Sequence, residues 1–185
     1  TRDIAALTTA QVEVIAVASL VDMATGQLNA LSTDQIRALT TDQIDALTSV
    51  QMGQLTTAQV ASLNTAQVSN LDSVDLAAMT TAQWAALTTA QAASLTVGQI
   101  PNLATDDLRA ISTANLRAMN TQQIDALSSD QMAVLTNGPD ATAGSMSSLR
   151  KNAGARVPMV AATVRAGTGR RRRSSATPMP AHSVK

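Results

Sequence analysis

The sequence predicts an all-α fold: a solenoid, or superhelix, of short capped helices with one helix in each eight-residue repeat. Three observations predict it. An apolar residue recurs at every eighth position from Leu7 to Leu135 without a register slip. Most repeats begin with a helix-capping pattern. A basic segment without repeats follows the last of them, and we expect that segment to be disordered.

Sixteen octads run from Thr8 to Leu135, with the consensus Thr-Thr-(Ala/Asp)-Gln-Ile-x-Ala-Leu. Positions five and eight are always apolar. One continuous helix would not place these positions on one face. Each residue turns the helix by about 100°, so eight residues rotate the apolar positions by about 80° from one octad to the next. A continuous strand would point the two positions to opposite faces. Each octad must therefore contain its own turn.

The beginning of each octad supplies a helix start. A hydroxyl at the cap and a glutamine three residues later form a capping box, in which each satisfies a backbone N–H. Either threonine of each Thr-Thr pair can serve as the cap. The clearest examples are the pairs Thr40 with Gln43, Thr56 with Gln59, and Thr80 with Gln83.

Helices of one or two turns are unstable alone, so their apolar side chains must stack on neighbouring octads. Trp84 holds a core register, with an exposed contact residue as the alternative interpretation. Gly53 and Pro101 should weaken their helices, and octads 16–23 and 24–31 are irregular enough to form an N-terminal cap. The predicted repeat core includes Leu31, Ile36, Leu39, Ile44, Leu47, Leu55, Leu63, Trp84, Leu87 and Leu95.

The chain divides into two parts: an octapeptide-repeat α-solenoid over residues 1–136, and a flexible basic tail over residues 137–185. The repeat ends in Thr136-Asn137-Gly138-Pro139, a stop signal. Residues 1–140 hold all thirteen acidic residues against four arginines, a net charge of −9, and residues 141–185 carry +9. The sequence therefore predicts an acidic body with a basic tail.

The inventory of chemical groups predicts a protein that is not an enzyme and holds no cofactor or metal. Cysteine is absent, and the one histidine, His182, lies in the tail. The adjacent carboxylates of Asp106 and Asp107 are typical of the first turn of a helix, where they offset the backbone dipole. No phosphate-binding loop or nucleophile motif occurs. No apolar stretch approaches the roughly 20 residues of a membrane span.

The stretch Leu39-Thr40-Thr41-Asp42-Gln43-Ile44-Asp45-Ala46-Leu47 resembles the Leu-Thr-Thr-x-Gln arrays of large secreted bacterial surface proteins, often labelled adhesion or haem-utilisation proteins. The resemblance covers about residues 7–136. It implies a repeat architecture and an extracellular or cell-surface location, with a cytoplasmic location as the alternative. The haem label finds no support in these residues, since methionines at core registers are poor evidence for ligation.

These observations favour a structural or interaction protein: a spacer, adhesin stalk or filament subunit that self-associates. The repeated threonines could also offer a hydroxyl-rich face to a polysaccharide or another surface polymer. If the basic tail assists contact between copies, assembly should weaken at high salt. The alternative is a polyanion-binding module, which would contact nucleic acid or another acidic polymer through the tail residues Arg170, Arg171, Arg172 and Arg173.

Overall fold

The computed structural model describes residues 2–137 and confirms the all-helical solenoid, with one short helix per octad and no β-strand in this range. The first helices are α1 (Arg2–Ala5), α2 (Thr9–Glu13), α3 (Val17–Val21), α4 (Thr25–Leu28), α5 (Thr33–Ala38), α6 (Thr41–Asp45), α7 (Ser49–Gln54) and α8 (Thr57–Ser62). They continue as α9 (Thr65–Asn70), α10 (Ser73–Ala78), α11 (Thr81–Ala86), α12 (Thr89–Ser94), the 3-10 helix η1 (Ile100–Asn102), α13 (Thr105–Ala110), α14 (Thr113–Ala118), α15 (Thr121–Asp125) and α16 (Ser129–Asn137).

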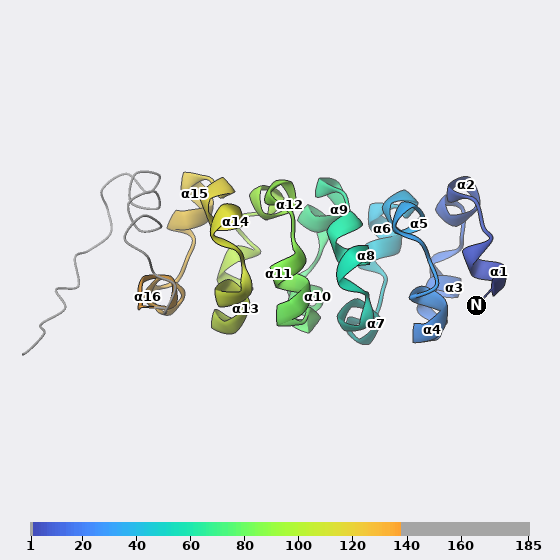
Figure 1. The fold of residues 1–185 in the computed structure, drawn as a ribbon, viewed down its shortest axis with the longest axis horizontal. Helices are drawn as coiled ribbons and strands as arrows, with labels where there is room; N and C mark the ends of the chain where they lie inside the picture. The colour runs from blue at the N-terminus through green and yellow to red at the C-terminus, as the bar shows by residue number, and fades with distance from the viewer. Residues whose placement is uncertain (1, 138–185) are drawn as a thin grey trace, which may run out of the picture.

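The helices wind into an elongated coil whose long axis runs from α1 to α16 (Figure 1). Helices α2, α5, α9, α12 and α15 lie along one side, and they begin at residues 9, 33, 65, 89 and 121. Their starts are thus alternately three and four octads apart. One turn of the coil therefore takes about 28 residues, or three and a half octads, and each helix packs against the helix three octads further on, as α8 does on α11.

The first threonine of each pair is the helix cap. In the octad of α8, the Thr56 hydroxyl accepts a hydrogen bond from the Gln59 N–H at 3.2 Å, and the Thr56 N–H donates to Gln59 Oε1 at 2.9 Å. Thr57 is then the first helical residue and is exposed. The same reciprocal pair joins Thr40 to Gln43 and Thr80 to Gln83. Position two is therefore not needed for capping, and it is exposed in most octads, with Thr25, Thr41 and Thr105 half-buried.

The core lies along the inside of the coil and is built from positions five and eight. The ten residues predicted for it are each at most 6% exposed. Trp84 is fully buried, and its indole Nε1 has no hydrogen-bond partner within the described part of the chain. The next octad carries Ala92 at the same position. The largest side chain of the core is thus followed one octad later by the smallest.

Gly53 and Pro101 both alter their helices, in different ways. Pro101 lacks an N–H, and its octad forms the short 3-10 helix η1 in place of an α-helix. Gly53 lies in the regular helix α7, where a Cβ atom would meet the carbonyl oxygen of Ala78 on α10 at 2.7 Å. Glycine at this position therefore lets two neighbouring turns of the coil approach each other closely.

We expect Gly53→Ala to lower the free energy of unfolding by about 1–3 kcal/mol, because a backbone carbonyl cannot move aside cheaply. The matched control is Gly26→Ala in α4, where nothing lies within 4 Å of the new methyl group. That variant should gain about 0.4–1 kcal/mol. Urea titrations followed by circular dichroism measure both, and equal effects of the two substitutions would contradict the close approach.

Candidate functional site

The most regular polar feature of the structure is a row of buried glutamines at position four, which we call the glutamine ladder. Gln59 shows its geometry: Oε1 accepts from the Thr56 N–H, while Nε2 donates to the carbonyl oxygens of Leu28 and Leu31 at 3.0 and 2.9 Å. Those carbonyls lie 31 and 28 residues earlier in the chain. The ladder consists of Gln35, Gln43, Gln51, Gln59, Gln67, Gln83, Gln91, Gln99, Gln123 and Gln131.

The ladder joins the start of one helix to the end of another in the preceding turn of the coil. The carbonyls that it reaches belong mainly to positions five and eight, near the C-terminus of each short helix, where the last carbonyls lack partners within the helix. The position-five carbonyl also accepts from the position-eight N–H of its own octad, as Leu28 does from Leu31. The amide oxygen meanwhile satisfies a free N–H at its own helix start. One side chain thus serves two helix ends, and this requires an acceptor and a donor in the same group.

Glutamine meets this requirement, because its side chain carries both an acceptor and a donor and is long enough to reach both carbonyls. Glutamate can complete a capping box equally well, but its carboxylate has no N–H to donate to a carbonyl of the preceding turn. Asparagine is shorter, and Asn115 reaches a single ladder carbonyl, that of Leu87, at 2.6 Å. Sequence reasoning assigned these glutamines a local capping role alone. No signal within a single octad reveals the second role, because the carbonyls that Nε2 reaches lie 28 and 31 residues earlier in the chain.

Two aspartates interrupt the ladder, and burial raises the pKa of both. Asp75 on α10 is 4% exposed and its Oδ2 has no hydrogen-bond partner in the described residues. Burial, and then the negative charges of Asp72 and Asp45, raise the pKa of Asp75 to about 6. Burial and the adjacent Asp106 also raise the pKa of Asp107, although a hydrogen bond from the Ala104 backbone opposes the shift.

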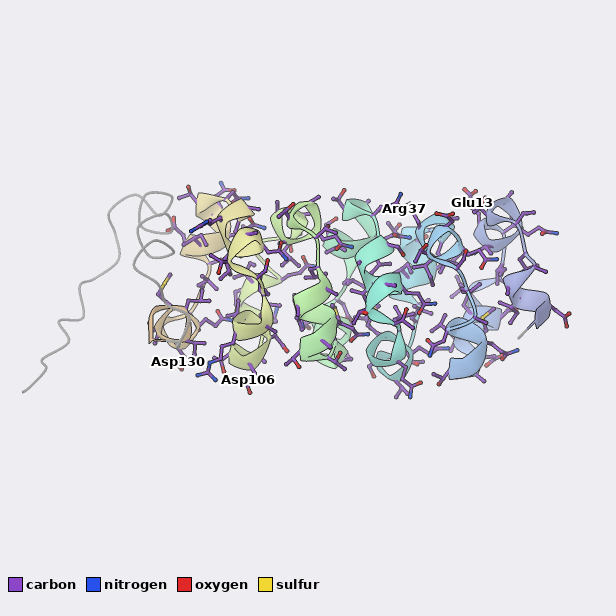
Figure 2. The ribbon with its side chains drawn as sticks, in the orientation of Figure 1. Glu13, Arg37, Asp106 and Asp130 are labelled. Atoms are coloured by element: carbon purple, nitrogen blue, oxygen red, sulfur yellow. The ribbon has the colours of Figure 1, made fainter. Side chains whose placement is uncertain are left out.

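The other charged side chains between Asp3 and Asp130 lie on the outside of the coil. Glu13 and Arg37 lie along one edge of the view in Figure 2, and Asp106 and Asp130 along the opposite edge. Asp106 pairs with Arg109 at 2.8 Å one helical turn away, and both side chains are more than half exposed. Such a pair contributes little to stability. The predicted polyanion contacts Arg170 to Arg173, and His182, lie outside the described residues.

Residues 2–137 hold no group of three or more His, Cys, Asp or Glu side chains placed to bind a metal ion. No helix in this part of the chain is long and apolar enough to cross a membrane.

Fold and ladder together define the class of protein: an octapeptide-repeat α-solenoid. The family model of the ALTTAQ repeat matches residues 20–57, 68–105 and 100–137, which is more than half of the chain, and the protein belongs to this family. The motif itself occurs unchanged from Ala86 to Gln91, where it spans the end of one octad, the cap and the ladder glutamine of the next. No curated protein and no solved structure matches the chain significantly.

Removing an interior ladder glutamine should cost more stability than removing one that only caps. Gln91→Met leaves the buried Leu63 carbonyl without its Nε2 donor and leaves the Val60 carbonyl with the Leu63 N–H alone. It also removes the capping bond from the Thr88 N–H, and the losses together should cost about 1.5–5 kcal/mol. The matched variant Gln11→Met loses the capping bonds to Thr8 alone, about 0.5–2 kcal/mol. Urea titrations compare them, and equal losses would show that the ladder contributes nothing beyond capping.

Asp75 should make the protein less stable as the pH rises. The folded state keeps the Asp75 proton up to about pH 6, whereas the unfolded chain releases it near the ordinary pKa of 3.8. The folded state therefore binds more protons between these values, and stability falls across that window by about 1–3 kcal/mol.

Asp75→Gln restores the consensus donor and should remove this loss, so that the variant is more stable than the wild type at pH 7.5. Asp34→Asn, at an exposed position three, controls for the change in charge. Denaturant midpoints between pH 4 and 8 measure both variants. An Asp75→Gln protein with the pH dependence of the wild type would show that Asp75 does not titrate in this window.

Proposed function

We propose that this protein is a non-enzymatic structural element: a stiff spacer, adhesin stalk or filament subunit that self-associates. The observation that carries the proposal is the glutamine ladder. It commits the most regular polar side chains of the repeat to hydrogen bonds between successive turns of the coil. A protein whose repeated polar side chains form hydrogen bonds to its own backbone is suited to keeping a fixed and extended shape.

The repeat also makes length adjustable. Each octad contacts its neighbours through the same core positions, and ten of the sixteen octads add ladder bonds, so the stability of an array is roughly a sum of local terms. An array can therefore gain or lose octads without redesign of its core. This is the property that a spacer or stalk requires, and the elongated coil of Figure 1 is consistent with it.

The second threonine of the pair offers a surface for a partner. Thr57, Thr81 and Thr89 are exposed and are the first residues of their helices, so their hydroxyls are not used in capping. We propose a polysaccharide or another hydroxyl-rich surface polymer as a ligand for this face, at the cell surface or outside the cell. The resemblance to secreted surface arrays supports this location.

Small-angle X-ray scattering with light scattering tests the spacer. We expect the distance distribution of a rod, with a maximum at the cross-section and a long, nearly linear decline. A compact globule of 185 residues would instead give a radius of gyration of about 16 Å. Mass that grows with protein concentration would support self-association. A compact profile at every concentration would contradict the proposed function.

A further inference from the structure

Helix α10 is the place where the glutamine ladder is interrupted on both sides. In the regular ladder a helix such as α8 binds the preceding turn through its own glutamine, and its carbonyls are bound by the glutamine four octads further on. For α10 both positions hold aspartate: Asp75 on α10 itself, and Asp107 on α13. Each of the other octads between residues 32 and 103 carries its own ladder glutamine.

The surroundings of α10 are irregular as well. It packs against α7 and η1, three octads before and after it. On the α7 side the two backbones approach so closely that Gly53 has no room for a side chain. On the other side the neighbour is η1, a single 3-10 turn that contains Pro101. In the following turn, α13 begins at Ala104, which provides no side-chain cap. Non-consensus residues spread over 53–107 thus gather around one helix.

An aspartate at position four can bind the preceding turn only while it carries a proton. Asparagine has the same side-chain length, and Asn115 Nδ2 donates to the carbonyl of Leu87, 28 residues earlier, at 2.6 Å. For Asp75 the carbonyl at this spacing is that of Leu47. A protonated carboxyl group has one O–H to donate there, whereas a carboxylate has none. The buried Oδ2 of Asp75 has no hydrogen-bond partner among the described residues, as expected of the oxygen that would carry this proton.

We propose that α10 is a proton-controlled joint in the coil. With both protons in place, Asp75 donates to the carbonyl of Leu47 and Asp107 donates to that of Met79 on α10, so that α10 is joined to the turns before and after it. When the protons leave, both bonds are lost, and the coil opens locally at α10 while glutamines still hold the helices on either side. The joint lies within one chain and does not depend on self-association.

The charges on neighbouring elements favour release near neutral pH. Helices α7, η1 and α11 carry no ionisable side chain. The cap of α10 and helices α6, α13 and α16 add one cation, Arg109, which pairs with Asp106. Their other ionisable side chains are acidic: Asp42, Asp45, Asp72 and Asp130. Burial, and then Asp72 and Asp45, raise the pKa of Asp75 to about 6, so its bond to the preceding turn forms below that pH and is lost above it. Burial also raises the pKa of Asp107.

Hydrogen–deuterium exchange of the full chain, resolved by peptide and corrected for intrinsic exchange rates, tests the joint at pH 5 and pH 7.5. The internal reference is α8, which glutamines bind on both sides. Relative to α8, we expect the amides of α10 to exchange about tenfold faster at pH 7.5 than at pH 5. The reason is that the closed state loses the Asp75 proton in this interval, whereas the open state has already lost it.

The double variant Asp75→Asn with Asp107→Asn keeps the side-chain length and holds a donor at every pH. Its α10 should exchange as slowly at pH 7.5 as the wild-type helix does at pH 5. The matched control is Asp34→Asn with Asp125→Asn, which removes the same charge at two exposed positions and should leave the response of α10 unchanged. Equal acceleration of α8 and α10 would show that the whole coil responds and that α10 is no joint. An α10 that ignores pH, or that still responds in the double variant, would overturn the proposal.

Discussion

The backbone of a very short helix has more unpaired groups than paired ones, and this constraint shapes the whole molecule. A helix leaves its first four N–H groups and last four carbonyls without intrahelical partners, and most helices here contain only four to six residues. Burying such helix ends without hydrogen-bond partners would cost more free energy than burial of the apolar side chains contributes. Capping threonines satisfy one end locally. The ladder glutamines satisfy both ends at once and bind each turn of the coil to the one before.

The ladder also explains where the repeat tolerates change. Position three is exposed in every octad, and position six is exposed in all but the octads of Gly53, Ala61 and Ser69; these positions accept side chains as different as Ala, Asp, Val and Arg. Position four is far more restricted, and its departures have physical costs. Asp75 buries a carboxylate oxygen without a partner, and Asn115 keeps one bond in place of two. Gly53 shows a restriction of a different origin, since its constraint comes from a neighbouring backbone and not from its own octad.

Much of this architecture can be predicted from the sequence because its signals are local. The eight-residue period excludes a continuous helix or strand, and Thr56 with Gln59 predicts a cap by their spacing alone. The second role of Gln59 could not be predicted, since it depends on carbonyls 28 and 31 residues away and therefore on the pitch of the coil. The exposure of Val14 and the burial of Asp75 likewise depend on which octads become neighbours in space.

The coil and the sequence repeat have different periods, and this mismatch determines how the surface is arranged. A turn of about 28 residues is not a whole number of octads, so each octad points about 100° away from the last around the axis. Seven octads, over two turns, bring the same azimuth back. Losing or gaining a single octad would therefore leave the core intact yet rotate everything attached beyond it. The number of octads between two points on this coil therefore determines the direction as well as the distance from one to the other.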